Sequence, residues 1–424
     1  MKKFYSLFIS IIVVCSNIKA QSWSPVGGGM SNLVEGLGVY NGELYAGGFF
    51  SSAGGVSANH IAKWNGTNWS AVGSGMDSDV TSFAVYNGEL YAGGFFSSAG
   101  GIPANFLAKW NGTNWSAVGD FGGVYDGDVN ALAVYNGELY AGGWAIGANG
   151  VSTNSIAKWN GSTWSALGSG INDGIFSLAV YNGELYAGGN FTIASGDPAN
   201  YIAKWNGTSW SAVGPNTANE RVFSLAVYNG ELYAAGYFTS IGGISANNIA
   251  KWNGSSWSPV SSGMSGTYLG TYSGVFELTV YNGELYAAGR FTSAGSNIVN
   301  NIAKWNATSW SAVGTGLTNA GGYVWPEANA LAVYNGELYA GGYFNTAGSI
   351  PAMFIAKWSN CNRPAQPGPI TGNTSVCSNT TQLYSIPQIS GATSYTWTLP
   401  SGWTGSSTSN TIISTPGRRR WIPG

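Results

Sequence analysis

The octapeptide Val-Tyr-Asn-Gly-Glu-Leu-Tyr-Ala occurs seven times in this 424-residue chain, and this repetition constrains the fold more than any other feature. Its Asn residues lie at positions 41, 87, 136, 182, 229, 282 and 335, so one repeat spans 46 to 53 residues. Each unit continues with Ile-Ala-Lys-Trp-Asn-Gly or a near variant about 20 residues on, and then with Trp-Ser-Ala-Val-Gly or a near variant. The chain is therefore built from repeated structural units.

One unit divides into four short strands. Val129 to Tyr135 is apolar almost throughout, as expected of an inner strand that is covered on both faces. Asn136-Gly137 suits a type I′ hairpin turn, because both residues tolerate positive φ, and Glu138 to Gly143 forms the second strand. A loop of about ten residues leads to Ile156 to Trp159, and a second Asn-Gly turn leads to Trp164 to Gly168. Four-stranded units of this period predict a β-propeller.

The two ends of the repeat region complement one another. Trp23 to Gly27 is a fourth strand with no unit before it, and Ile355 to Trp358 is a third strand with no fourth strand after it. Six intact units and this shared one predict a seven-bladed propeller over residues 21–358, closed by the N-terminal strand. The alternative is an open solenoid or an array of separate hairpins, neither of which has a use for complementary ends.

Composition favours an extracellular all-β protein. Aromatic residues make up 14% of the chain and charged residues only 8%, so apolar burial is ample. The formal net charge is −2, and loss of Lys2, Lys3 and Lys19 with a leader would take it to −5. Because no basic stripe is present, we expect no nucleic-acid partner.

Residues 1–20 have the pattern of a signal peptide. Lys2-Lys3 precede an apolar stretch from Phe4 to Val14, and Ala20 is a small residue suited to cleavage before Gln21. The stretch is too short to span a bilayer, so we expect no membrane span and a secreted or outer cell-surface location. Cys15 raises the alternative of a lipoprotein, but Val14 is bulkier than a lipobox usually accepts.

The composition changes after the last repeat. Residues 359–369 form a proline-rich linker, residues 370–415 hold Thr/Ser-rich strand-like runs, and residues 416–424 fit no strand pattern. The run from Gly391 to Trp403 resembles a PKD-like, immunoglobulin-type module, of which only part is present. Such modules are common spacers in exported surface proteins. Cys361 and Cys377 are candidates for a disulfide in an oxidising compartment, and the alternative is a pair of free thiols.

The repeats resemble kelch units of the galactose-oxidase central-domain type. Leu90 to Gly94 carries the Leu-Tyr-Ala-Gly-Gly run, and Trp110 and Trp115 supply the pair of aromatics that follows it. The resemblance implies a propeller of exported proteins. The copper chemistry of galactose oxidase has no equivalent here, so we expect no metal and no cofactor.

Residues that recur in every unit are interpreted first as scaffold. Fourteen of the nineteen Trp occupy the two repeat positions, so packing explains them better than sugar stacking does. A Glu at the start of the second strand and a Lys near the end of the third recur in the same way, for example Glu43 and Lys63. These predict one cross-strand ion pair in each blade.

Function is expected where the units differ. The tight Asn-Gly turns lie on one face of the disc, and the variable connections lie on the other, where binding specificity is usually built. The candidate ligand-binding residues follow the second strands or lie in the long connections: Trp144, Asn190, Tyr237, Arg290, Tyr343, Tyr268, Tyr272, Tyr323 and Trp325. Aromatics mixed with amides suit a carbohydrate or protein ligand. The alternative is that these aromatics cap the blades without a ligand.

Catalysis has little support in the sequence. His60 is the single histidine, and the nearest acid pairs are Asp77 with Asp79 and Asp126 with Asp128. We therefore expect a monomeric, non-catalytic binding or adhesion protein. The alternative is a secreted carbohydrate-active enzyme, a glycosidase or lyase, which convergent acids at the centre of the ring would favour.

Overall fold

The computed structural model describes residues 10–14, 21–119, 127–144, 147–148, 151–266, 272–320, 325–359, 371, 380–386, 394–399 and 403–416. The chain divides into two compact units, Trp23–Ser359 and a second made of Met1–Ser22 with Asn360–Gly424. Every regular element in the described ranges is a β-strand. Accordingly, none of the described residues belongs to a helix long and apolar enough to cross a membrane.

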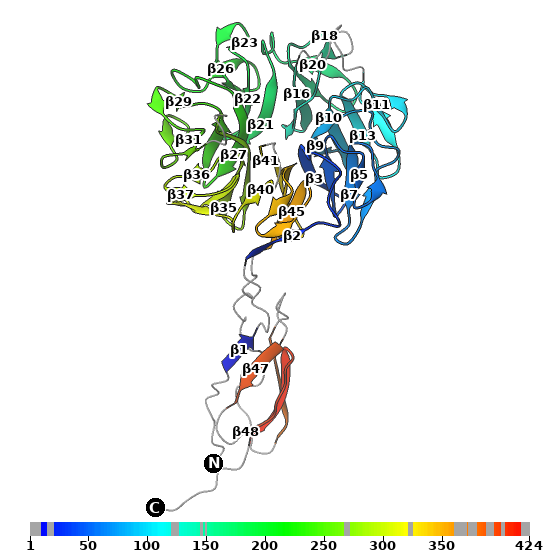
Figure 1. The fold of residues 1–424 in the computed structure, drawn as a ribbon, viewed down its shortest axis with the longest axis vertical. Coiled ribbons are helices and arrows are strands. Elements are labelled where there is room, and N and C mark those ends of the chain that lie inside the picture. Colours follow the sequence, from blue (N-terminus) through cyan, green and yellow to red (C-terminus); the bar gives the residue numbers. More distant parts are fainter. Residues whose placement is uncertain are drawn as a thin grey trace, which may run out of the picture. The chain divides into compact units, whose positions relative to one another are not determined.

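The larger unit contains seven four-stranded antiparallel sheets arranged in a ring (Figure 1). We call each sheet a blade. The inner strands are β3 (Gly36–Tyr40), β9 (Val80–Tyr86), β15 (Ala131–Tyr135), β21 (Ile175–Tyr181), β27 (Val222–Tyr228), β34 (Gly274–Tyr281) and β41 (Glu327–Tyr334). The second strands are β4 (Glu43–Gly47), β10 (Glu89–Gly94), β16 (Glu138–Gly142), β22 (Glu184–Gly189), β28 (Glu231–Gly236), β35 (Glu284–Arg290) and β42 (Glu337–Tyr343).

The outer half of each blade follows the same order. The third strands are β7 (Ile61–Trp64), β13 (Leu107–Trp110), β19 (Ile156–Trp159), β25 (Ile202–Trp205), β31 (Ile249–Trp252), β38 (Ile302–Trp305) and β45 (Ile355–Ser359). The fourth strands are β8 (Trp69–Ala71), β14 (Trp115–Ala117), β20 (Trp164–Ala166), β26 (Trp210–Ala212), β32 (Trp257–Pro259), β39 (Trp310–Ala312) and β2 (Ser22–Pro25). The predicted all-β propeller is therefore confirmed.

The connections between second and third strands contain more structure than the sequence indicated. Where we expected an irregular loop of about ten residues, each blade has a short two-stranded hairpin, stabilised by its own turn. These hairpins are β5 (Ser52–Ala53) with β6 (Val56–Ser57), β11 (Ser98–Ala99) with β12 (Ile102–Pro103), β17 (Gly147–Ala148) with β18 (Val151–Ser152), β23 (Ile193–Ala194) with β24 (Asp197–Pro198), β29 (Ser240–Ile241) with β30 (Ile244–Ser245), β36 (Ser293–Ala294) with β37 (Asn297–Ile298), and β43 (Thr346–Ala347) with β44 (Ile350–Pro351). Two of them gain a third strand, β33 (Met264–Ser265) and β40 (Leu317–Thr318).

Residues at fixed places in the repeat join each blade to the next. Asn41 and Gly42 have φ of 48° and 74°, which is the left-handed conformation that a type I′ turn requires. The Tyr40 hydroxyl donates to the carbonyl of Gly88 in the following blade at 2.9 Å. On the outer side, Trp69 Nε1 donates to the Val26 carbonyl of the preceding blade at 3.1 Å. The recurring Tyr and Trp therefore hold neighbouring blades together.

Each blade also carries the predicted ion pair between its second and third strands. Their N–O distances lie between 2.7 and 2.9 Å, and both side chains are partly exposed in every pair. The pairs are Glu43–Lys63, Glu89–Lys109, Glu138–Lys158, Glu184–Lys204, Glu231–Lys251, Glu284–Lys304 and Glu337–Lys357. At this exposure each contributes on the order of 0 to 1 kcal/mol.

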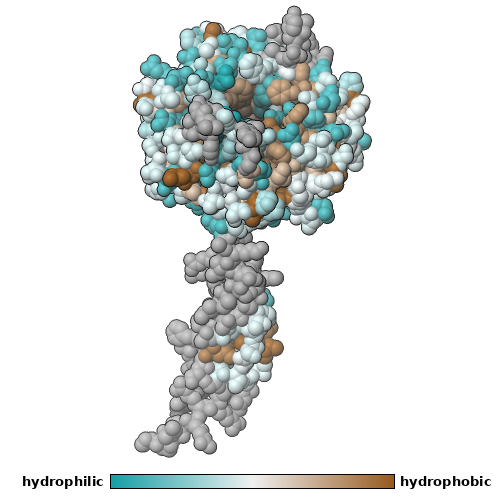
Figure 2. Space-filling view, in the orientation of Figure 1, coloured by the Kyte–Doolittle hydropathy of each residue, from teal (hydrophilic) through white to brown (hydrophobic). Residues whose placement is uncertain are grey.

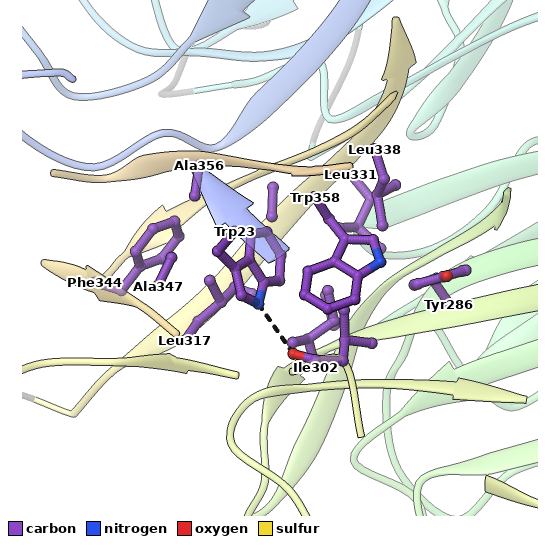
Figure 3. Packing of buried hydrophobic residues seen from close by; sticks show 14 of the residues in the cluster. Trp23, Tyr286, Ile302, Leu317, Leu331, Leu338, Phe344, Ala347, Ala356 and Trp358 are labelled. Carbon is purple, nitrogen blue, oxygen red and sulfur yellow. Dashed lines mark hydrogen bonds between the residues drawn. The ribbon is translucent and has the colours of Figure 1, made fainter. Parts of the chain in front are cut away.

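The N-terminal strand closes the ring. β2 pairs with β45, and the Trp23 and Trp358 rings lie 5.3 Å apart between centroids. Trp23 Nε1 donates to the Val313 carbonyl of the preceding blade at 3.0 Å (Figure 3). On the inner side, the Tyr334 hydroxyl reaches the Gly42 carbonyl at 3.0 Å, so the last blade contacts the first through the same bond that joins the others.

Five short strands lie in the described part of the second unit. β46 (Gln382–Ser385), β49 (Thr411–Pro416) and β48 (Trp403–Thr404) form one sheet in that order. β1 (Ser10–Val14) pairs with β47 (Ser394–Thr398). Because β1 lies within the predicted signal peptide, this pairing belongs to the chain before the peptide is removed. Cys361 and Cys377, the disulfide candidates, lie outside the described residues.

Candidate functional site

A bulge interrupts the inner strand of five blades, all near the face that carries the variable connections. The pairing register shifts at this point in β9, β21, β27, β34 and β41. A bulge of this kind redirects a side chain and is frequent beside binding sites. We call the residue at this place of the repeat the axial residue. The seven axial residues are Glu35, Thr81, Asn130, Phe176, Phe223, Phe276 and Asn329.

Three of the axial residues belong to a continuous series of aromatic rings. The Trp144 and Phe176 centroids are 6.4 Å apart, and Phe176 stacks on Phe223 at 5.2 Å with an interplanar angle of 27°. Phe223 then meets Tyr237 at 4.9 Å and Phe276 at 5.6 Å, edge to face in both contacts. We call these five residues the aromatic arc. Figure 2 shows apolar residues gathered near the centre of the ring on the face that it displays.

Glycines in the next blade make room for two rings of the arc. A Cβ atom at Gly174 would collide with the Trp144 indole, and one at Gly274 would collide with the Tyr237 ring. Trp144 is also fixed by its backbone N–H, which donates to Asp128 Oδ1 at 2.6 Å, while its side chain stays 40% exposed. The two predicted aromatics are therefore held by the scaffold with part of each ring accessible.

The Asn190 side chain is hydrogen-bonded to other residues of the protein and is not free to contact a ligand. Its Nδ2 donates to Asp173 Oδ2 at 3.1 Å, and its Oδ1 accepts from Arg221 Nε of the next blade at 2.8 Å. Both ends of the amide are used within the protein. The side chain would have to exchange a partner in order to bind a ligand.

Arg290 is a cation beside the aromatic arc. Its guanidinium forms an ion pair with Glu327 of the next blade, and its Cζ lies 5.9 Å from the Phe276 ring centroid. Its Nε atom is buried and has no hydrogen-bond partner among the described residues. The contact with Phe276 has the geometry of a cation–π interaction.

Carboxyl groups gather on the other side of the ring. Burial, together with the negative charges of Asp79 and Glu327, raises the pKa of Glu35 to about 7. Its Oε2 atom is buried without a partner in the described part of the chain. Asp79 Oδ1 lies 2.9 Å from His60 Nδ1, and burial also raises the pKa of Asp128. Asp79 and Glu327 therefore both lie within electrostatic range of Glu35.

Glu277 is a further carboxyl on an inner strand. Burial raises its pKa to about 8, against the opposing effect of hydrogen bonds from Ser224 and the Leu278 backbone. Other blades have Gly, Ala or Ser at this place of the repeat. Glu277 is thus a second carboxyl that favours its neutral form near neutral pH.

The remaining predicted residues are dispersed. The Tyr343 ring packs against Phe354 with centroids 5.5 Å apart, Tyr272 is 84% exposed, and Trp325 is half-buried. Tyr268 and Tyr323 lie outside the described residues, as does Asp126. Asp77 does not join Asp79, because its Oδ1 accepts the backbone N–H groups of Ser97 and Ser98 at 2.9 Å.

The axial residues were missed by sequence reasoning, although a signal for them was present. Their position in the repeat holds Glu, Thr, Asn or Phe, so it varies between blades, as does the position after the second strands from which candidate residues were chosen. It was passed over because the inner strand was interpreted as uniformly apolar. The same comparison between repeats, extended to the inner strands, would have found Phe176, Phe223 and Glu35.

Potential metal ligands are not grouped in the described structure. No three or more His, Cys, Asp or Glu side chains in the described residues are placed to hold a metal ion.

Comparisons with known proteins match two parts of the chain to family models. Residues 363–417 match the PKD-like domain family, and residues 229–255 match a β-propeller domain of unknown function. No curated protein matches.

Solved structures with similar folds include the WD40 β-propeller domain of Doa1, with a TM-score of 0.49 and 13% identity over 80% of this chain and 97% of that one. The computationally designed protein Ika8 has a TM-score of 0.42 and 11% identity over 94% of this chain and 100% of that one. The two family models and the ring of four-stranded sheets show that the chain combines a β-propeller with a PKD-like domain.

Proposed function

We propose that this is an exported, kelch-like seven-bladed propeller that binds carbohydrate without cleaving it, through the aromatic arc on its variable face. The observation that carries the proposal is the unbroken contact from Trp144 through Phe176 and Phe223 to Tyr237 and Phe276. Flat rings offer contact area to the apolar face of a sugar at a low entropic cost. The leader predicted at residues 1–20 and the PKD-like domain at residues 363–417 support export to the cell surface.

Carbohydrate fits this surface better than a charged ligand does. Among the described residues beside the arc, Arg290 is paired with Glu327 and Arg221 lies 3.6 Å from Glu220, so both positive charges already face a carboxylate of the protein. The carboxyl groups opposite the arc can accept hydrogen bonds from hydroxyl groups. A neutral, hydroxylated ligand with an apolar face can pack against the aromatic arc and also form hydrogen bonds with the carboxyl groups.

A glycan array probed with the purified protein tests this proposal. Phe223 contacts three other rings, so Phe223→Ala should lower affinity for the bound glycans by about ten- to a hundredfold. Val227→Ala is the matched control, because Val227 lies on the same strand toward the opposite face and is 40% exposed. Val227→Ala should bind like the unmodified protein.

Three results would contradict the proposal. They are an array with no bound glycan, equal loss of binding in both variants, and binding of peptides in place of glycans. Melting curves of both variants separate loss of the surface from loss of the fold.

A secreted carbohydrate-active enzyme is the second candidate, favoured by Glu35. A carboxyl group with a pKa of about 7 can donate a proton to a glycosidic oxygen at neutral pH. Asp79 or Glu327 would accept the proton of the attacking water, so the bond is cleaved by net addition of one water molecule.

Mass spectrometry of oligosaccharides incubated with the protein distinguishes the two candidates. The enzyme predicts products that carry one added water, and Glu35→Gln should abolish them while the glycan still binds. If the protein only binds glycans, the oligosaccharides should stay intact with both the unmodified protein and Glu35→Gln. Cleavage that persists in Glu35→Gln would exclude Glu35 as the acid.

A further inference from the structure

A separate cavity lies on the variable face of the first blade. Its volume is about 290 Å³, and its lining is Ser31, Asn32, Phe49, Phe50, Ser51 and His60. Small-molecule pockets commonly span about 300 to 1,000 Å³, so this cavity suits one small ring rather than an oligomer. None of its lining residues belongs to the aromatic arc.

One wall of the cavity is an aromatic ring that is open to solvent. Phe49 is 55% exposed, whereas Phe50 beside it is 2% exposed and packs in the core. The Phe49 and His60 ring centroids are 6.0 Å apart, so His60 supports one edge of the open ring. An exposed aromatic face beside a cavity can receive the apolar face of a pyranose.

The geometry of His60 fixes which of its nitrogens carries hydrogen. Nδ1 lies 3.1 Å from the Gly48 carbonyl and 2.9 Å from Asp79 Oδ1, and both of these oxygens are acceptors. Nδ1 must therefore be protonated, and in the neutral ring Nε2 is an acceptor. No partner of Nε2 lies among the described residues, so this acceptor is available to a ligand.

Asn32 supplies the complementary donor. Its Oδ1 accepts the backbone N–H of Leu33 at 2.9 Å, which leaves Nδ2 without a partner in the described structure. Ser31 Oγ accepts the N–H groups of Ser51 and Ser52 at 3.1 Å, so its own proton remains free to donate. The cavity thus combines an aromatic face with two donors and one acceptor.

Charge excludes one class of ligand. The Asp79 carboxylate lies directly behind His60, and Glu35 is close enough to Asp79 for their charges to interact. An anion would be repelled by this arrangement, whereas a neutral polyhydroxylated ring would not.

We propose that the cavity is a second binding site, which takes a single neutral sugar residue. Phe49 stacks on the sugar, and His60 Nε2 and Asn32 Nδ2 hold its hydroxyl groups. The inference rests on the proposed function only for the class of ligand, since its residues and contacts are its own.

The other blades supply matched substitutions for His60. The equivalent residues include Phe106, Asn248 and Phe354, and they share its left-handed backbone, with φ of 63°, 63° and 62° against 60° for His60. His60→Phe and His60→Asn should therefore fold, because the scaffold already accepts both residues at this φ. Both remove the Nε2 acceptor.

Saturation-transfer NMR with the full chain and methyl glycosides of glucose, galactose and mannose tests the site. We expect at least one glycoside to bind, with about fivefold or greater loss of affinity in both His60 variants and in Phe49→Ala. Val227→Ala, on the Asn-Gly turn face, should leave this binding unchanged. The proposal is overturned if no glycoside binds, or if the His60 variants retain affinity. It is equally overturned if Phe223→Ala alone removes binding.

Discussion

Single carboxyl groups on the inner strands make the stability of this protein depend on pH. Glu277 has a pKa of about 8 in the folded protein, above its ordinary value of 4.5, because burial disfavours its charge. Its contribution to stability is complete below the ordinary pKa and is lost as pH rises toward 8. The contribution of Glu35 to stability is likewise lost as pH rises toward its pKa of about 7.

Glu277→Gln should therefore flatten the decline in stability at rising pH. We expect the unmodified protein to lose on the order of 4 kcal/mol between pH 5 and pH 9 through Glu277, and the variant to lose less. Thermal melting at pH 5, 7 and 9 measures the difference. Glu284→Gln is the control, since Glu284 forms a partly exposed ion pair on the same blade. Parallel pH profiles for all three proteins would contradict the assignment.

Residues with one role in every blade were predictable from the sequence, and residues with a role in one blade were not. Glu43 and Lys63 recur at fixed spacing, so their ion pair followed from strand order alone. Arg290 and Asn190 were singled out for their variability, and the structure gives both a partner that holds them in place. Variation between blades therefore reflects matched contacts between neighbours as well as exposure to ligand.

Among the elements, the short strand β2 is the one that closes the ring of blades. Its Trp23 is 6% exposed, packs against the tilted Trp358 ring and donates a hydrogen bond to the Val313 carbonyl of the preceding blade. This strand could be predicted from the complementary ends of the repeat region. The bulges that carry Phe176 and Phe223 could not, because strand periodicity does not show where a register shifts.

Trp23→Ala should destabilise the propeller as much as the same change inside an intact blade. Trp69 is the equivalent residue of the first blade, with 5% exposure and the same bond to a Val carbonyl. We expect each substitution to cost about 3 to 5 kcal/mol, the usual range for a buried Trp. Chemical denaturation of both variants measures this. An unaffected Trp23→Ala beside a destabilised Trp69→Ala would show that β2 does not close the ring.

Over the whole molecule, the two faces of the ring differ in what they can recognise. Near the Asn-Gly turns every blade exposes the same residue, with exposed fractions of 39% to 45%: Val39, Val85, Val134, Val180, Val227, Val280 and Val333. The opposite face carries the aromatic arc on one side and carboxyl groups on the other. Only the second face has the asymmetry needed to hold a ligand in one orientation.

The location of the bound ligand tests this account most directly. A crystal structure of the protein with the tightest-binding glycan from the array would place the sugar on one face. The account predicts a sugar ring in contact with the aromatic arc, with Phe223 or Trp144 against its apolar face. A sugar bound beside the exposed valines of the Asn-Gly turn face, with the arc unoccupied, would contradict it.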